Sequence, residues 1–258
     1  MEGDETPFAP ERKGLRREDC YFYHVMDVPG LGAVEGDWDL RGRLDAYLGG
    51  IGLDGRRVLE IGPASGFLTF EMEKRGAAVT AVEVTDEPGW DFVPFPSHVL
   101  DPHLGPRRDI MARLKNSWWF NHAAFGSKAK LIYGDVYDLP RAIGVFDIAV
   151  MGAVLLHLRA PLQVVEQCAR RADTLVITDM YCPELEGAPV CRLVPDPTND
   201  RWDTWWEFST SFLTQFLGVM GFATVTTTHE QTHRGRTYTL FTIVARRERT
   251  PGVAPSPG

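Results

Sequence analysis

A loop at residues 60–66 carries the residue types that bind a small, charged ligand. It reads EIGPASG and follows the short apolar run RVLEI, which is typical of a buried strand. Gly62 and Gly66 let the backbone turn tightly and let a ligand approach it closely. The helix expected next, over 67–75, leaves free N–H groups in its first turn. We therefore predict a strand, a binding loop and a helix, in this order.

The spacing within this loop separates two classes of cofactor. A nicotinamide fingerprint needs three glycines, which would fall here at 62, 64 and 67. Position 64 is alanine and position 67 is phenylalanine, so this fingerprint fails twice. The E-x-G-x-x-x-G spacing instead resembles the first motif of the class I S-adenosylmethionine methyltransferases.

Two acidic residues close the next expected strands in the register of the same family. Glu83 ends the strand 79–84, and Asp135 follows the strand 130–134. A carboxylate can accept hydrogen bonds from both hydroxyls of a ribose. The resemblance implies that the first acid binds the ribose of S-adenosylmethionine and that the second lies against the adenine amino group. The cofactor contacts that it implies are Glu60, Gly62, Pro63, Ala64, Gly66, Glu83, Asp135, Val136, Met151 and Gly152.

A finer resemblance covers roughly residues 20–245. The chain is similar to a bacterial branch of the class that includes the tRNA wobble-uridine 5-oxyacetic acid methyltransferase, which uses carboxy-S-adenosylmethionine. The segments that carry this resemblance are Tyr23-His24 with Asp27, Trp38–Arg41 (WDLR), Gly134–Pro140 (GDVYDLP) and Leu155–Arg159 (LLHLR).

Net charge bears on the acceptor of the methyl group. The 258 residues include 27 Lys and Arg against 35 Asp and Glu, a formal net charge of −8. An enzyme that binds a long stretch of nucleic acid needs a positively charged surface, which this excess of acidic residues disfavours. We therefore expect a small-molecule acceptor in a bacterial biosynthetic pathway. Modification of the tRNA wobble uridine, and binding of S-adenosylmethionine without catalysis, are the two alternatives.

Two insertions interrupt the alternation of strands and helices, at 85–129 and 181–208. They hold six of the seven tryptophans. Both follow strands, so both are expected beyond the carboxyl ends of the sheet, where open α/β sheets bind ligands. Packing onto the sheet is the alternative role for each aromatic ring. The predicted acceptor contacts are Trp118, Trp119, His122, Tyr181 and Trp206.

An oxygen acceptor usually needs a general base. His157 is the first candidate, because it follows the fourth strand of the predicted sheet and histidine titrates near neutral pH. Tyr23 and His24 are the second candidates, and a packing role is open for all three. No metal is expected, although Asp179 with Asp200 leaves a catechol-type metal site open.

The elements around these residues predict one α/β domain. Strands at 57–62, 79–84, 130–134, 146–151 and 174–178 alternate with helices, including those at 67–75 and 161–172, which implies a parallel sheet covered on both faces. A helix from 209 or 210 to 220 precedes strands at 223–228 and 237–245, which flank a His233-Arg234-Gly235 turn. We predict a doubly wound, Rossmann-like class I methyltransferase fold. Its mainly parallel sheet has seven strands and ends in an antiparallel C-terminal hairpin.

The chain divides around that domain. The methyltransferase domain is expected at 50–245, with a lid segment at 19–49 that forms a small cap together with the two insertions. Charged or proline-rich tails are expected at 1–18 and 246–258. No secretory signal and no run of about 18 apolar residues is visible, so the protein is expected in the cytoplasm without a membrane partner. Four scattered cysteines suit free thiols, and the oligomeric state is left open.

Overall fold

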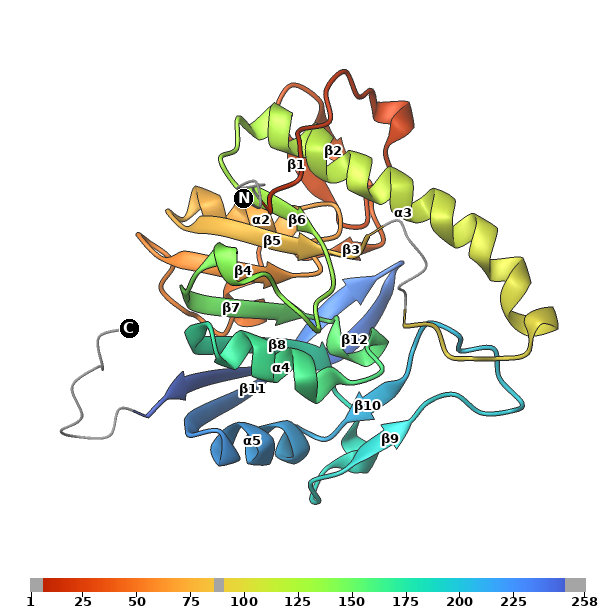
Figure 1. Cartoon of the computed structure of the whole chain (residues 1–258), viewed down its shortest axis with the longest axis vertical. Coiled ribbons are helices and arrows are strands. Elements are labelled where there is room, and N and C mark those ends of the chain that lie inside the picture. The colour runs from red at the N-terminus through yellow and green to blue at the C-terminus, as the bar shows by residue number, and fades with distance from the viewer. Residues whose placement is uncertain (1–6, 86–90, 249–258) are drawn as a thin grey trace, which may run out of the picture.

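The computed structural model describes residues 7–85 and 91–248. The ends of both predicted tails (1–6 and 249–258) and part of the first insertion (86–90, with Trp90) lie outside the described residues. Within the described residues the main sheet has eight strands, in the order β3-β11-β12-β8-β7-β4-β5-β6. Figure 1 shows this twisted sheet with helices on both sides.

Five parallel strands form the centre of the sheet. They are β4 (Arg57–Ile61), β5 (Ala78–Glu83), β6 (Lys130–Tyr133), β7 (Phe146–Gly152) and β8 (Ala172–Met180). The chain proceeds outward from β4 to β5 and β6, then returns to pair β7 with the other side of β4. The order of the strands therefore reverses between β4 and β7. A ligand crevice is expected at the carboxyl ends of the strands at such a reversal.

The remaining strands of the sheet are antiparallel. The long hairpin of β11 (Phe222–His233) and β12 (Arg236–Arg247) turns at Arg234-Gly235, and β12 pairs with β8. The short strand β3 (Trp38–Asp39) from the N-terminal segment pairs with the tip of β11. This pairing adds an eighth strand to the seven that were predicted. The strand was not predicted because the sequence around Trp38 shows no strand pattern.

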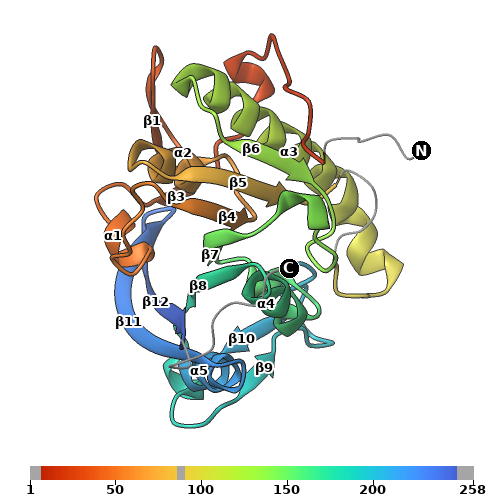
Figure 2. The ribbon, with the colours of Figure 1, turned by 60° about the vertical axis from the view of Figure 1, so that its left-hand side comes forward.

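Helices cover the two faces of the sheet unequally. They are α1 (Leu44–Tyr47), α2 (Phe67–Lys74), α3 (Ser97–Phe125), α4 (Pro161–Ala169) and α5 (Thr210–Val219). Successive strand residues point to opposite faces, so Val58 packs with α1, α2 and α3, whereas Leu59 packs with α4 and α5. The two views agree that α3 runs along one side of the molecule and α4 and α5 lie on the other (Figures 1 and 2).

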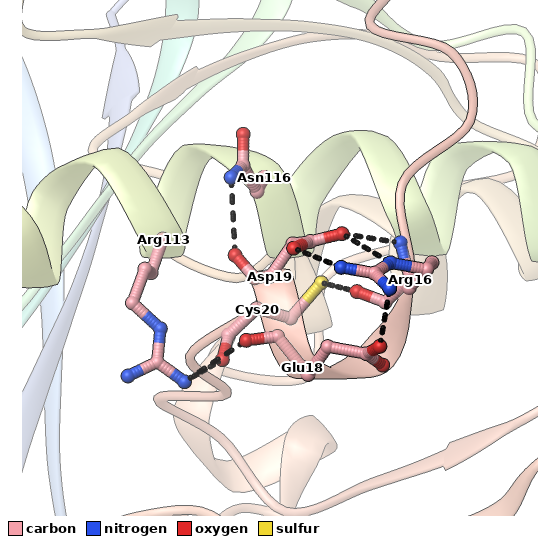
Figure 3. Close-up of polar contacts among 6 residues, drawn as sticks. All are labelled: Arg16, Glu18, Asp19, Cys20, Arg113 and Asn116. Atoms are coloured by element: carbon pink, nitrogen blue, oxygen red, sulfur yellow. Dashed lines mark hydrogen bonds and ion pairs between the residues drawn. The ribbon is translucent and has the colours of Figure 1, made fainter.

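The N-terminal segment packs on α3 and on β6. Ala9 donates a backbone hydrogen bond to Leu131 on β6, at 2.7 Å. After a short 3-10 turn (Arg17–Asp19), Arg113 and Asn116 of α3 donate to the backbone oxygens of Cys20 (2.8 Å) and Asp19 (3.0 Å), as Figure 3 shows. Residues 7–18, predicted as part of a tail, therefore contact the body of the domain.

Two small hairpins complete the described chain. The strands β1 (Met26–Val28) and β2 (Gly32–Val34) form one, and β9 (Cys191–Leu193) and β10 (Trp206–Phe208) form the other, within the second insertion. In the part of the chain that the structure describes, no helix combines the length and the apolar character needed to cross a membrane.

Candidate active site

A cavity of about 530 Å³ opens at the carboxyl ends of β4, β5, β6 and β7. Strand ends form its floor, and the N-terminal segment, α3 and the tip of the β11–β12 hairpin form its walls. Its size falls within the range of small-molecule sites. The predicted cofactor and catalytic residues that line it are Tyr23, His24, Gly62, Pro63, Ala64, Glu83, Asp135, Val136, Gly152 and His157.

The loop between β4 and α2 has the backbone conformation that its glycines predict. Gly62 (φ 72°) and Gly66 (φ 90°) both adopt left-handed geometry, and Ala64 does so at φ 51°. A Cβ on Gly66 would lie 2.3 Å from Cε2 of Phe70, so glycine is needed there for packing as well. Gly66 caps α2 without a side-chain acceptor, which leaves the first N–H groups of the helix directed outward. Gly62, Pro63 and Ala64 of this loop line the cavity, whereas Gly66, which is also a predicted cofactor contact, is not among the described residues that line it.

Glu83 presents a nearly buried carboxylate to the cavity. Its Oε1 accepts a hydrogen bond from the backbone N–H of Val84 at 2.8 Å. Burial raises the pKa of Glu83, while backbone N–H groups and the positive charge of Lys115 oppose that rise. A carboxylate held in this way can accept further hydrogen bonds from a ligand.

Asp135 and its neighbours lie at the end of β6. Asp135 is exposed and lines the cavity, and its Oδ1 accepts from the backbone N–H of Tyr137 at 2.8 Å. Val136 and Gly152 also line the cavity. Met151 is fully buried in the core beneath α4, and it does not line the cavity.

Glu60 lies below the binding loop rather than on the cavity wall. Its side chain is buried, and Oε2 accepts a hydrogen bond from the hydroxyl of Thr69 on α2, at 2.5 Å. Within the described residues its Oε1 has no partner. Burial raises the pKa of Glu60 to about 8, so the carboxyl group is largely neutral at pH 7.

His157 lies on the opposite wall, in a 3-10 turn after β7 (Leu155–His157). Its Nδ1 contacts the backbone oxygen of Asp203. A carbonyl oxygen only accepts, so in the neutral ring Nδ1 carries the proton and Nε2 is left as the basic nitrogen. Burial lowers the pKa of His157, which keeps the ring neutral near pH 7. This tautomer is the one that a general base requires if Nε2 meets the acceptor.

Tyr23 and His24 lie together on the N-terminal segment. The hydroxyl of Tyr23 accepts a hydrogen bond from Nε1 of Trp38 at 3.0 Å, and burial raises the pKa of this phenol. His24 is buried beside Phe67, and burial lowers its pKa to about 4. Burial disfavours the charged form of all three groups. His157 differs in that its Nδ1 is bound to the Asp203 carbonyl, which leaves Nε2 as the basic nitrogen.

The aromatic residues of the insertions pack the fold together. Trp118 is buried and donates through Nε1 to the Thr69 hydroxyl at 3.2 Å; Trp119 donates to the Tyr133 hydroxyl at 2.9 Å. His122 stacks on Trp118. None of these three lines the cavity in the part of the chain that the structure describes.

The same holds for the two candidates in the second insertion. Trp206 donates to the backbone oxygen of Arg159 at 3.2 Å, and the Tyr181 backbone donates to Thr239 at 3.0 Å. Neither is among the described residues that line the cavity. The insertions instead contribute Asp91, Arg107, Ile110, Met111, Leu114 and Asp203 to its wall.

A polar cluster that the sequence did not reveal closes the cavity on the N-terminal side. Arg234, at the hairpin tip, binds Asp37 with two hydrogen bonds of 2.7 and 3.0 Å, and the Tyr21 hydroxyl donates to the same carboxylate at 2.6 Å. Trp38 stacks on His233, with ring centroids 4.4 Å apart. All five residues line the cavity. Arg234 was visible only as a turn residue, because its partner Asp37 lies 197 positions away.

Charged residues could also hold a metal, but the described part of the chain contains no cluster of three or more His, Cys, Asp or Glu side chains arranged to do so. Asp179 is buried at the end of β8, where Oδ1 accepts from the Met180 N–H at 2.8 Å. Burial raises the pKa of Asp179 to about 7.

No protein-family model and no curated protein matches the sequence. Solved structures do resemble it. The N-terminal domain of EvdMO1, in the presence of S-adenosylhomocysteine and D-fucose, has a TM-score of 0.56 and 16% identity over 90% of this chain and 93% of that one. A methyltransferase of Methanosarcina mazei that depends on S-adenosylmethionine has a TM-score of 0.54 and 17% identity, over 81% and 98%.

A third similar structure is the 1,6-didemethyltoxoflavin-N1-methyltransferase of Burkholderia thailandensis with bound S-adenosylhomocysteine. Its TM-score is 0.51 and its identity 19%, over 80% of this chain and 75% of that one. At these identities the likeness establishes the fold, so the chain has the Rossmann-like methyltransferase fold. The fold class predicted from the sequence is confirmed.

Proposed function

We propose that the protein is an S-adenosylmethionine-dependent methyltransferase that acts on a small molecule. The observation that carries the proposal is the convergence of three strand ends on one cavity. Gly62 after β4, Glu83 at the end of β5 and Asp135 after β6 all line it. These are cofactor contacts that the sequence motif implies, and they line one cavity although 73 positions separate Gly62 from Asp135.

Within this proposal, the chain binds the adenosine half of the cofactor over β4, β5 and β6. Glu83 accepts hydrogen bonds from the ribose hydroxyls, and Asp135 faces the adenine. S-adenosylmethionine supplies an electrophilic methyl group when bound. The protein contributes by holding the acceptor in line with that group, which can account for roughly 7–11 kcal/mol of barrier lowering.

For an oxygen acceptor we propose His157 as the general base. Its Nδ1 is committed to the Asp203 carbonyl, so Nε2 is the nitrogen that can take a proton. A positioned base contributes about 10²–10⁴-fold to the rate. A nitrogen acceptor with a free lone pair would make less use of this group.

The proposal of a small acceptor rests on the dimensions and walls of the cavity. Its volume is about 530 Å³, and the N-terminal segment and the hairpin tip both line it. The solved structures that share the fold include an enzyme named for toxoflavin methylation. Transfer of a methyl or carboxymethyl group to the tRNA wobble uridine, and binding without catalysis, stay alternatives for the test below.

Calorimetric titration with S-adenosylmethionine and S-adenosylhomocysteine tests the first half of the proposal. We expect binding with micromolar affinity, and absence of heat at millimolar cofactor would refute the class. Release of S-adenosylhomocysteine is then measured against a panel of small heteroaromatic and phenolic acceptors, with unmodified tRNA as a separate arm. Turnover with tRNA alone would refute the small acceptor. Binding without turnover on either arm would favour the inactive alternative.

A further inference from the structure

Tyr47, which lies outside the sequence motifs of the cofactor site, places a phenol ring on the cavity wall. The residue is only 4% exposed, yet it lines the cavity. Among the described residues, its hydroxyl has no hydrogen-bond partner. The ring is buried, and the hydroxyl is not among the buried side-chain atoms that lack a partner, so it is accessible from the cavity. A ligand in the cavity can therefore accept a hydrogen bond from it.

The position of Tyr47 is fixed from below. The hydroxyls of Thr178 on β8 and Thr242 on β12 both donate to the Tyr47 backbone oxygen, at 2.7 and 3.2 Å. A Cβ on Gly152 would lie 2.9 Å from the Tyr47 hydroxyl oxygen, so the glycine provides the space for the phenol. The hydroxyl is therefore held at the carboxyl end of β7 and is not free to turn outward.

The position of Tyr47 indicates which part of the cofactor it would contact. Glu83 and Asp135 lie on the β5 and β6 side of β4, where the adenosine half is proposed to bind. Tyr47 lies on the other side of β4, beside Gly152, so the opposite end of an extended cofactor reaches it. That end is an α-amino acid, whose carboxylate accepts hydrogen bonds. Burial raises the pKa of Tyr47, so the phenol is a donor at neutral pH.

We propose that the Tyr47 hydroxyl donates a hydrogen bond to the carboxylate of the amino-acid end of the cofactor. This inference rests on the proposed function, because it requires that the chain binds S-adenosylmethionine. It assigns Tyr47 a binding role, in which the first turn of α2 offers further N–H donors to the same group.

A comparison of two ligands isolates this contact. S-adenosylhomocysteine carries the amino-acid end, and 5′-methylthioadenosine keeps the adenosine and the sulfur but lacks it. Tyr47→Phe retains the ring and removes only the hydroxyl. We expect its Kd for S-adenosylhomocysteine to rise about tenfold or more, as for the loss of a hydrogen bond to a charged group. The Kd for 5′-methylthioadenosine should change less than twofold.

Tyr238→Phe is the matched control. This tyrosine lies on β12 against the ring of Trp38 and is not among the residues that line the cavity. Its variant should bind both ligands as the wild type does. Thermal denaturation supplies a second readout, because loss of an unpartnered hydroxyl should leave the Tm of Tyr47→Phe unchanged or higher.

Three results would overturn the inference. The affinity of Tyr47→Phe for S-adenosylhomocysteine could equal that of the wild type, or both ligands could weaken equally, or the Tm could fall together with binding. Each of these outcomes leaves the proposed function intact, since the wild type still binds the cofactor. Failure of the wild type to bind either ligand would instead refute the proposed function, and the inference with it.

Discussion

Glu83→Gln is the sharpest test of the cofactor register. The substitution keeps the size of the side chain and removes its charge. The Val84 N–H needs an acceptor, so the amide oxygen of glutamine stays on that bond and the NH₂ group turns to the ligand. The variant therefore presents a donor where the wild type presents an anionic acceptor. It loses at least one hydrogen bond of the charged kind, about 1.5–3 kcal/mol.

That loss corresponds to a Kd for S-adenosylhomocysteine about 10- to 100-fold higher, since each 1.4 kcal/mol is a factor of ten. Isothermal titration calorimetry measures it directly. Glu166→Gln is the matched control. This glutamate lies on α4 and pairs with Arg170 at the protein surface. It should bind as the wild type does.

The pH dependence of cofactor affinity is a second test of the role of Glu83. Burial raises its pKa above the ordinary value of a glutamate, so the carboxylate becomes protonated at a higher pH than it would in water. Binding needs the charged form. Wild-type affinity should therefore fall as the pH is lowered through this raised pKa, while that of Glu83→Gln should stay level. Equal affinities at neutral pH, or parallel pH profiles, would show that Glu83 does not contact the cofactor.

Three further predictions concern the framework of the site. Trp118→Ala should lower the free energy of unfolding by about 3–5 kcal/mol in urea denaturation, because the ring is fully buried; the partly exposed Trp206→Ala should cost less than half as much, and equal losses would contradict this assignment. Glu60 has a folded pKa of about 8 against an ordinary value of 4.5, so its contribution to stability is complete below about pH 4.5 and is lost as the pH rises towards 8. Glu60→Gln should therefore have a higher Tm than the wild type at pH 8 and a smaller advantage at pH 5, and a constant difference would argue against a neutral buried carboxyl. Gly66→Ala, which needs a Cβ 2.3 Å from Phe70 at a φ of 90°, should destabilise the fold by about 2 kcal/mol and weaken S-adenosylhomocysteine binding; wild-type stability and affinity would contradict the packing argument.

The grouping of the proposed cofactor contacts at one cavity could be predicted because its signals are local. Gly62 follows, and Glu83 ends, a strand that is a short and mainly apolar run of sequence. Parallel strands bring their carboxyl ends to one edge of the sheet, so strand order alone places these residues together. Strands β4 to β8 and helices α2, α4 and α5 were predicted for the same reason, with boundaries displaced by a few residues at most.

The helix α3 was harder to predict. Its 29 residues include Pro102 and Pro106, and proline inside a helix removes a hydrogen bond and clashes with the preceding turn. The aromatic residues that follow do not reveal which way they point. Trp118 turns towards α2 and Trp119 towards β6, whereas Ile110 and Met111, less conspicuous in the sequence, line the cavity.

The N-terminal wall of the cavity depends on contacts between distant segments. Asp37 meets Arg234 across 197 positions, and Tyr47 is held by Thr178 across 131 and by Thr242 across 195. Local sequence patterns cannot reveal such pairs, because the two partners are far apart in the chain. Each of these residues, taken alone, could equally be an ordinary surface or core residue. Only the tertiary fold brings them to one wall.

The floor and the walls of the cavity differ in how far they can determine which acceptor is methylated. The floor of the cavity consists of the carboxyl ends of the strands. Substitutions there would alter the cofactor site, because residues at these strand ends are the proposed cofactor contacts. The walls come from the N-terminal segment, α3 and the hairpin tip, and apart from Tyr47 their side chains can vary while the strands beneath them stay in register. Substitution of the Asp203 side chain should therefore change which acceptor is methylated and leave the Kd for S-adenosylhomocysteine within a few-fold of the wild type. Loss of cofactor affinity in such a variant would mean that the two halves of the cavity are not separable, and that Asp203 contacts the cofactor as well.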